Sequence, residues 1–452
     1  MNRKEEYQAL LAELQQTPPE LETTLQRAEA RQRNSCRRHW LSVPAGSLAA
    51  CFLAFVLLVN LFPPFAKACS AVPVLGRLAE AVSWSPTLSA AVEHDYVQPM
   101  GLSQTENGIT ATVEYLIVDQ KQVNIFYTLD GPYDKLAADM PEFLPEQRCS
   151  TISSGFPEPP GTMQQITMDY GDTDVPDRFT MLLSVFGENE ADRAPYQAPD
   201  RLYEDEMLEP VQREEPEILA SFRFELTFDP NFTDKGERIQ LDQCIRVDGQ
   251  TLTVTDIEVY PTHVRVNITG APENTAWLKG LEFYLENEDG LRFEPISNGV
   301  SGTGAPDKPE MASFRLESPY FASSRHLTLY ITGATWLDKD MERVRVDLAH
   351  ETADRLPEGV SIASFDHREG GWVLYFRAAY RKESSVYQVW SMTYYDAEGN
   401  SFETGRYGSS TGSEGIFEVM LPLPDYHGEE VWLEPAYSRT TREETPVAVP
   451  VK

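Results

Sequence analysis

The sequence predicts a mostly β external part, one transmembrane helix and a short helical cytoplasmic segment. Three observations lead to this fold class. No charged residue occurs from Trp40 to Ala66. After about residue 109, apolar and polar residues alternate with a period of two through much of the chain, which is typical of half-buried strands. Two long stretches in the C-terminal part resemble each other. We therefore expect tandem immunoglobulin-like β-sandwiches after an α+β membrane-proximal domain.

The first 39 residues show two helical patterns. Leu10, Leu11 and Leu14 recur on one face of the first pattern, and Leu21 and Leu25 share a face of the second, which begins at the capping-box sequence TPPE. A segment of this length is too short to bury an adequate core alone. It is either a helix that merely leads into the membrane or a docking site for a cytoplasmic protein, and the second interpretation is favoured because both apolar faces need a partner.

The uncharged run over residues 40–66 predicts a transmembrane helix. As a helix it would extend roughly 40 Å, which is enough to cross a bilayer. A cleaved signal peptide is an alternative, because the sequence AKAC after the run has the small-x-small form of a cleavage site. A buried helix of a soluble domain is a further alternative. An anchor fits better, because a signal peptide has a shorter lead and a shorter apolar stretch.

The charges on either side of this run predict its orientation. Five arginines lie between Arg27 and Arg38, whereas only Lys67 and Arg77 follow over a similar distance. The positive-inside rule then places the N-terminus in the cytoplasm and the C-terminal bulk outside the cell membrane. The whole chain has a formal net charge of −33. This acidic balance argues against direct binding to nucleic acid, which requires concentrated Lys and Arg.

Residues 67–230 form the expected membrane-proximal domain. The sequence PVLGRLAEAVSW has helical spacing, and a second short helix is expected from Pro86. Two strands joined near Asp119 to Gln122 follow in GITATVEYLIVDQKQVNIFYTL. The sequence SFRFELTF alternates as a further strand. These patterns together predict an α+β domain.

Residues 231–352 and 353–452 are expected to be two β-sandwiches that arose by duplication. Val254 aligns with Ile362, and Tyr284 aligns with Tyr394. Hairpin turns are expected at Asp248-Gly249, Asp289-Gly290 and Glu398-Gly399, because Gly accepts the positive φ angles that such turns require. The domain size and the strand rhythm resemble immunoglobulin-like domains, but paired cysteines are missing.

The five cysteines do not predict a metal or redox site. No two of them have CxxC spacing, and at most one disulfide could join the three that lie beyond the span, at Cys69, Cys149 and Cys244. Free thiols are the favoured state.

Several patterns that can carry chemistry are better explained by structure alone. The run Gly408 to Gly412 fits GxSxG, but it lies in a Gly/Ser-rich stretch expected to be a hairpin loop and not a nucleophile elbow. The aspartates of DYGDTDVPD could gather calcium, although a solvated acidic loop is favoured. Asp366-His367 is expected in a surface turn. Aromatic residues of the last unit are mostly core or cross-strand pairs, with a carbohydrate- or peptide-binding face as the alternative. We therefore predict no catalytic residues, no cofactor and no metal site.

The stretches TPPELETTLQRAEAR, LLVNLFPPFAKAC and PVLGRLAEAVSWSPTLSAAVEHDYVQP, followed by the two expected strands, resemble a family of single-pass membrane proteins of Gram-positive bacteria. Their external part contains a domain of unknown function, and many carry an immunoglobulin-like domain further out. Many resemble anti-sigma factors of extracytoplasmic-function sigma factors. The zinc motif of better-known anti-sigma factors, His-x3-Cys-x2-Cys, does not occur in residues 1–39.

This resemblance implies a membrane-anchored regulator whose external part senses an unknown ligand. A cytoplasmic sigma factor would bind the faces formed by Leu10, Leu11, Leu14, Leu21 and Leu25. The alternative is an envelope-binding or adhesive protein without a signalling role, and a secreted hydrolase ranks third.

Overall fold

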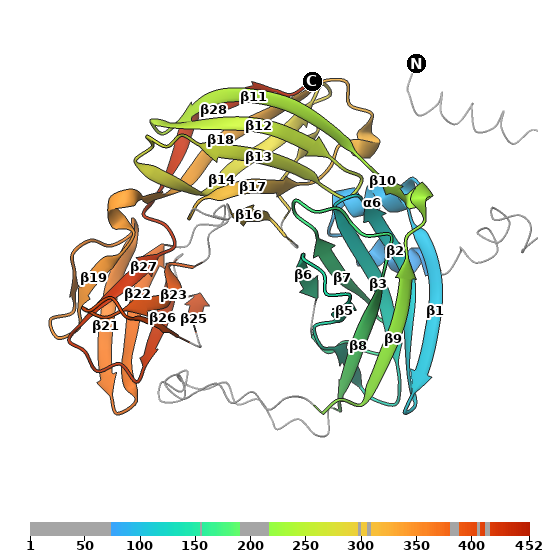
Figure 1. The fold of residues 1–452 in the computed structure, drawn as a ribbon, viewed down its shortest axis with the longest axis horizontal. Helices are drawn as coiled ribbons and strands as arrows, with labels where there is room; N and C mark the ends of the chain where they lie inside the picture. The colour runs from blue at the N-terminus through green and yellow to red at the C-terminus, as the bar shows by residue number, and fades with distance from the viewer. Residues whose placement is uncertain are drawn as a thin grey trace, which may run out of the picture. The chain divides into compact units, whose positions relative to one another are not determined.

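The structure is a computed structural model that describes residues 74–153, 156–189, 217–296, 300–304, 309–379, 388–404, 407–411 and 416–452. The helices expected over 1–39 and the span expected over 40–66 lie outside these residues. Within the described ranges, no helix is both long and apolar enough to cross a membrane. The described part is mostly β, as the alternation predicts, and its strands form three two-sheet sandwiches (Figure 1).

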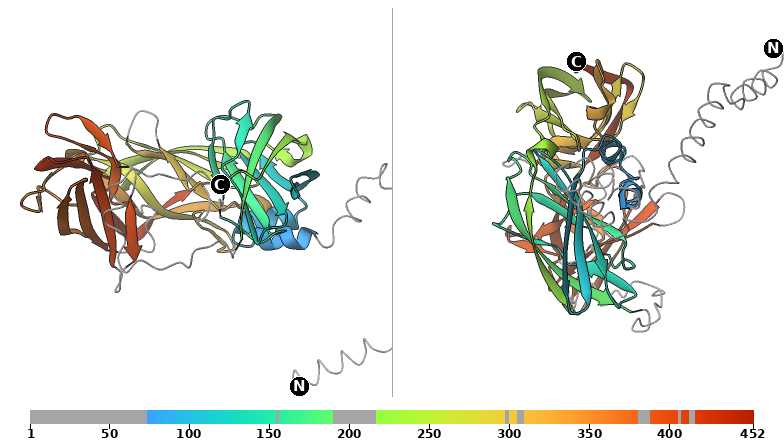
Figure 2. Two further views of the ribbon diagram at one scale, coloured as in Figure 1. Left: turned by 90° about the horizontal axis from the view of Figure 1, so that it is seen from below. Right: turned by 90° about the vertical axis from the view of Figure 1, so that its right-hand side faces the viewer.

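Two short helices, α5 (Val74–Ala81) and α6 (Pro86–Glu93), precede the first sandwich. Leu78 and Val82 are fully buried, in agreement with the helical spacing of the sequence. The Ser85 side chain caps α6 by accepting a hydrogen bond from the Leu88 backbone N–H, and Pro86 opens the helix because its missing N–H costs nothing there. Figure 2 shows both helices, in blue, at one end of the strands of this domain.

The first domain packs two antiparallel sheets face to face. One sheet has the order β1-β2-β3-β7-β6, and β10 adds to β2; the other has β4 and β5 on one side of β8 and β9 on its other side. The strands are β1 (Gln98–Glu106), β2 (Ile109–Asp119), β3 (Gln122–Asp130), β4 (Lys135–Ala138), β5 (Glu142–Leu144), β6 (Ser150–Ser153), β7 (Met163–Asp169), β8 (Arg178–Glu188), β9 (Ala220–Thr227) and β10 (Thr233–Asp234). The expected β2–β3 hairpin is confirmed. The alternation in SFRFELTF is confirmed in β9, where Phe222, Phe224 and Leu226 enter the core.

The second domain has sheets with the orders β11-β12-β13-β17-β16 and β15-β14-β18-β28. The strands are β11 (Glu237–Val247), β12 (Gln250–Val259), β13 (Val264–Gly270), β14 (Ala276–Asn287), β15 (Arg292–Phe293), β16 (Gly302–Gly304), β17 (Met311–Leu316), β18 (Leu327–Asp338) and β28 (Arg439–Pro450). Asp248 and Gly249 join β11 to β12 with φ angles of 50° and 73°. Two positive φ angles are those of a type I′ hairpin turn, so this predicted turn is confirmed.

The third domain has sheets with the orders β21-β22-β26-β25 and β20-β19-β27-β23-β24. The strands are β19 (Val344–Asp347), β20 (Thr352–Ala353), β21 (Val360–Arg368), β22 (Gly371–Ala379), β23 (Trp390–Tyr395), β24 (Ser401–Glu403), β25 (Gly408–Thr411), β26 (Ile416–Pro424) and β27 (Glu430–Pro435). Among the described residues, three 3-10 helices occur in connections: η2 (Pro230–Phe232), η3 (Tyr320–Ala322) and η4 (Lys339–Met341). The core of the third domain surrounds Trp390, which is fully buried.

The assignment of strands to sheets differs from the division expected at residues 352 and 353. The C-terminal strand β28 lies beside β18 in the second domain, where Val449 enters the core (Figure 1). Conversely, β19 pairs with β27 of the third domain. The third domain is therefore inserted between β18 and β28. Alternation in a sequence identifies a strand but not the sheet that the strand joins.

One expected correspondence between the repeats is also wrong in detail. Tyr394 is 2% exposed and belongs to the core of the third domain, whereas Tyr284 is half-buried and stacks on Tyr330 with ring centroids 5.2 Å apart. The two tyrosines thus lie on opposite faces of their sheets. An error of one residue in an alignment of strands reverses every side chain.

Candidate functional site

The most unusual polar feature of the described residues is a cluster of charged side chains where the first domain meets the second. We call it the polar junction and define it by Asp119, Asp169, Thr262, Arg265 and Arg315. Charged side chains are rarely buried unless they are paired. Here both Asp119 and Arg315 are essentially inaccessible to solvent, so their partners define how the two domains are joined.

The β2–β3 turn of the first domain provides the first contact. One carboxylate oxygen of Asp119 accepts hydrogen bonds from the backbone N–H groups of Lys121 (2.8 Å) and Gln122 (2.9 Å), and this closes the turn. The other oxygen accepts from the backbone N–H (3.0 Å) and the hydroxyl (2.5 Å) of Thr262, in the turn before β13. A single carboxylate thus shapes one domain and binds the next.

The end of β7 provides the second contact. Arg315 in β17 donates two hydrogen bonds to Asp169, from Nε to Oδ2 at 2.9 Å and from Nη2 to Oδ1 at 3.1 Å. Both side chains are at most 1% exposed. Such a bidentate pair fixes the relative orientation of the two side chains as well as their distance, because guanidinium and carboxylate are both planar.

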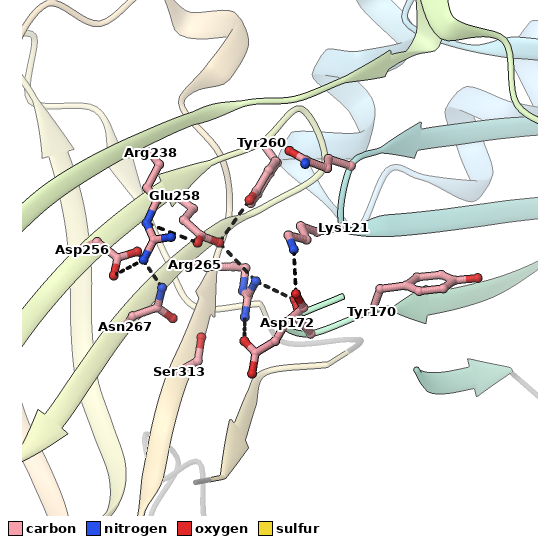
Figure 3. Close-up of polar contacts among 12 residues, drawn as sticks. Lys121, Tyr170, Asp172, Arg238, Asp256, Glu258, Tyr260, Arg265, Asn267 and Ser313 are labelled. Atoms are coloured by element: carbon pink, nitrogen blue, oxygen red, sulfur yellow. Dashed lines mark hydrogen bonds and ion pairs between the residues drawn. The ribbon is translucent and has the colours of Figure 1, made fainter. Parts of the chain in front are cut away.

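The loop after β7 continues the contact along the same face of the second domain. Arg265 in β13 donates to the backbone carbonyl of Gly171 (2.7 Å), and it pairs with Asp172 (3.3 Å) and with Glu258 of β12 (3.1 Å). Figure 3 shows this arrangement, in which Arg238 extends the row of alternating charges to Asp256 and Glu258. Opposite charges therefore alternate across three strands of the sheet and onto the loop of the first domain.

Lys121 holds that loop in place from within the first domain. Its ammonium group donates to the carbonyls of Asp172 (3.2 Å) and Thr173 (3.1 Å) and to the Asp174 carboxylate (2.8 Å). The aspartates of DYGDTDVPD were expected to form a solvated acidic loop. Asp172, Asp174 and Asp177 are exposed, in agreement with this expectation, whereas Asp169 is buried against Arg315. The exposed Asp172 and Asp174 also pair with Arg265 and Lys121. Their apparent excess of negative charge in the sequence is neutralised by residues far away along the chain.

Helix α6 provides a third contact between the two domains. Glu317, just after β17, accepts hydrogen bonds from the Thr87 backbone N–H (2.9 Å) and the Ser85 hydroxyl (3.1 Å). The hydroxyl of Thr87 in turn accepts from the backbone N–H of Ser318 (2.6 Å). A carboxylate near a helix N-terminus is favourable because the first N–H groups of a helix lack partners within it. The second domain thus completes the cap of a helix of the first.

Burial changes the protonation of the junction. Burial raises the pKa of Asp119 to about 6, against the opposing effect of its hydrogen bonds to Thr262, Lys121 and Gln122. Burial would also raise the pKa of Asp169, but the charge and hydrogen bonds of Arg315 outweigh it and lower this pKa to about 2. Burial lowers the pKa of His263 to about 3. His263 is therefore neutral at ordinary pH, and its 3.8 Å approach to Asp119 is not an ion pair.

The partner-binding residues predicted from the sequence, Leu10, Leu11, Leu14, Leu21 and Leu25, lie outside the described residues. Among the residues that the structure does describe, no group of three or more His, Cys, Asp or Glu side chains could hold a metal ion. Cys149 and Cys244, both described, are free thiols and not a pair.

Two expected loops are strands. Gly408–Thr411 of the GxSxG run is β25, which pairs with β26, so Ser410 lies in a strand and not in the expected hairpin loop. His367 lies in β21 and not in a turn, with its Nε2 3.1 Å from Nδ1 of His427. Ser410 is thus not at the strand-to-helix turn that a nucleophile elbow requires.

The sequence contains only a weak signal for the polar junction. In HVRVNITG, the residues His263, Arg265 and Asn267 alternate with valine and isoleucine, so they are expected to face solvent on a half-buried strand. They do lie on the outer face of the second sandwich, but the first domain covers part of that face. The Asp-x-x turn at Asp119 was recognisable, whereas its second partner, Thr262, was not.

Comparisons with known proteins match two segments of the chain. Residues 37–131 match a domain of unknown function, DUF4179, which is found in anti-sigma-factor-like membrane proteins. Residues 236–357 match a family of unknown function, DUF5643. The first match extends from the basic residues before the expected span to the end of the β2–β3 hairpin. The second covers β11 to β20.

No curated protein sequence matches the chain. The crystal structure of the conserved domain protein from Bacillus anthracis is similar over 60% of this chain and 82% of that chain, with 12% sequence identity and a TM-score of 0.38.

Proposed function

We propose that the protein is a membrane-anchored regulator similar to anti-sigma factors. In this proposal residues 40–66 span the cell membrane once, the N-terminus is cytoplasmic and the C-terminal bulk lies outside. Residues 1–39 bind a sigma factor, and the outer domains bind a ligand whose identity is open. The protein acts by binding and not by catalysis.

The observation that best supports a signalling role is the bond between Glu317 and the N-terminus of α6. This helix begins at Pro86, shortly after the proposed span, and its cap is completed by the second domain through Glu317 and Ser318. In this proposal a change in the second domain acts on α6, which α5 separates from the proposed membrane helix. The match of residues 37–131 to a domain of anti-sigma-factor-like membrane proteins supports the same interpretation.

A rigid joint suits this role better than a flexible linker. A flexible linker lets two domains move independently, so it cannot pass on a displacement. The polar junction instead combines a buried ion pair with several hydrogen bonds. The stabilisation that such hydrogen bonds and ion pairs provide is lost steeply when their geometry is disturbed. A ligand that favours one orientation of the outer domains would thus bias the membrane-proximal domain as well.

The binding test uses the full chain with Leu11→Asp and Leu25→Asp. Each change places a charge in the proposed contact and costs on the order of 2 kcal/mol or more if it is buried without a partner. We expect affinity for the sigma factor encoded nearest in the genome to fall at least about a hundredfold. Co-purification from membranes and titration with the peptide of residues 1–39 are the measurements.

A matched control adds the same charges on the opposite helical faces, with Gln16→Asp and Thr23→Asp. This control should bind as the unchanged chain does. If no cytoplasmic protein is retained, or if the two double variants bind equally, the sigma-factor proposal is wrong and an envelope-binding role becomes the better account. Protease added to intact cells tests the topology separately, because it should remove the C-terminal bulk and spare an N-terminal tag.

A further inference from the structure

The three domains share one arrangement of strands, although only the last two resemble each other in sequence. In each domain, a hairpin and two more strands form one sheet: β2-β3-β7-β6, β12-β13-β17-β16 and β21-β22-β26-β25. The opposite sheets contain the corresponding sets β4-β8-β9, β14-β18-β28 and β23-β27-β19. The order of strands in space is therefore the same three times, and each position can be compared between domains.

The last position of the second sheet is filled differently in each domain. In the first domain, β9 follows β8 along the chain and pairs with it antiparallel, for example Phe224 with Met181. In the second domain, the next named strand after β18 is β19, yet the neighbour of β18 is β28. In the third domain, β28 follows β27, yet the neighbour of β27 is β19. Each of the last two domains thus contains the strand that would end the other.

Each of the two strands carries a row of apolar residues with a period of two. Val344, Val346 and Leu348 alternate with polar residues and enter the core of the third domain. Val447, Val449 and Val451 are also spaced two residues apart, here alternating with Ala448 and Pro450, and they pack in the core of the second. A row of three branched apolar residues with a period of two is what the inner face of a terminal strand needs. Both strands therefore have the row of apolar residues that an inner face needs.

The two chain segments that connect these domains lie side by side where they cross. Ser438 donates its backbone N–H to the carbonyl of Trp336 (2.7 Å), and its hydroxyl accepts from the backbone N–H of Asp338 (2.9 Å). Arg439 donates from Nε to the Asp338 carboxylate (3.1 Å). On the side of the third domain, Glu358 donates its backbone N–H to the carbonyl of Ser438 (2.7 Å). The crossing is thus a bonded part of the fold.

From this arrangement we infer that the second and third domains have exchanged their final strands, β19 and β28. The exchange resembles the swapping of an element between two copies of a protein, but it takes place within one chain. It links the domains more firmly than a linker does, because separating them requires a complete strand pairing to break. The second matched segment, residues 236–357, includes β19 and not β28, which is the composition of an unexchanged unit.

Disulfide formation in the full chain distinguishes the two arrangements. In a background with the native cysteines changed to serine, Thr335→Cys is combined with Thr440→Cys, its partner across β18 and β28. Facing residues of antiparallel strands have Cα separations that a disulfide accepts. We expect most chains to form this bond within one chain, seen as a mass and mobility change that a reductant reverses.

The matched comparison keeps Thr335→Cys and moves the second cysteine to Arg345→Cys in β19. If β19 continued from β18 as a hairpin, with Val344 opposite Trp336, these two positions would face each other. We expect no bond here, because β19 pairs with β27. Arg345→Cys with Trp432→Cys tests the reciprocal strand pair and should form a bond. Formation of the 335–345 bond in place of the 335–440 bond, or of bonds only between two chains, would overturn the exchange.

Discussion

Arg315 is a fully buried arginine that is satisfied almost entirely by one carboxylate of another domain. Its Nη1 donates to Ser313 (2.6 Å), and its other donors bind Asp169. Desolvating the pair offsets much of its attraction, so the pair adds little net stability compared with apolar residues of similar size. Its main effect is on geometry, because neither charge can remain buried if the domains separate or rotate.

Removing one partner of this pair should therefore cost much more than removing both. Arg315→Met leaves Asp169 buried without its cation, and we expect a loss of about 3 to 5 kcal/mol in the free energy of unfolding. Arg315→Met combined with Asp169→Leu should recover much of this loss. Chemical denaturation of the three chains measures both quantities. A single variant as stable as the unchanged chain would contradict the buried pairing.

Asp119 makes the free energy of unfolding depend on pH with a sign opposite to that expected for a carboxylate in an ion pair. Its pKa rises to about 6 in the folded state, against a value of 3.8 in the unfolded chain. Between these two pKa values the folded state therefore binds more protons than the unfolded chain does. Stability is lost as the pH rises through about 6. The loss is on the order of 3 kcal/mol between pH 4 and pH 7.

Asp119→Asn keeps the size of the side chain and removes its titration. The unchanged chain should lose stability relative to this variant as the pH rises from 4 to 7, as measured by thermal unfolding at several pH values. His263 is present in both chains, so its own titration largely drops out of the difference. A difference that does not vary with pH would show that Asp119 remains ionised in the folded protein throughout.

At the scale of elements, the contact between α6 and the end of β17 links the first two domains. Glu317→Gln retains the shape of the side chain and removes its charge. We expect a loss of about 1 kcal/mol or more, because a charged cap is replaced by a neutral one. Hydrogen exchange of the Thr87 amide should accelerate, since its acceptor is Glu317. Glu294→Gln, at an exposed position directly after β15, is the control and should leave the hydrogen exchange of the Thr87 amide unchanged.

The elements themselves could be predicted from the sequence to a large extent. The β2–β3 hairpin, the helix at Pro86, strand β9 and the turn at Asp248-Gly249 all depend on local signals: alternation, a capping serine before proline, and residues that accept positive φ. The partners of β19 and β28 could not be predicted, because both strands carry apolar residues with a period of two and this pattern does not identify the sheet that a strand joins. The polar junction was also beyond prediction, since outward-facing charges such as Arg265 look the same whether water or another domain covers them.

For the whole molecule, strand exchange predicts what a shortened chain will do. A chain that ends at residue 357 lacks β28 but retains β19, and an unpaired edge of β18 would be exposed. We expect β19 to occupy this edge, because it carries a row of apolar residues with a period of two and the connection through η4 is short. The bond between Thr335→Cys and Arg345→Cys, which we do not expect in the full chain, should now form.

The control for this experiment is a chain that ends at residue 342, which lacks both final strands. It should be less stable or aggregate, since one edge of the sheet remains open. If the chain ending at 357 behaves in the same way as this control, then β19 is specific to the third domain and the two strands are not equivalent.

The position of β28 also determines when the second domain can be completed during synthesis. About 100 residues separate β18 from its partner, which at 5 to 20 residues per second corresponds to roughly 5 to 20 seconds of chain growth. During this interval β19 is the nearest strand available, and its early pairing with β18 would block the later partner. Strand β27 emerges just before β28 and takes β19 as its own neighbour. Pairing of β19 with β27 would therefore leave the edge of β18 open for β28, its final partner.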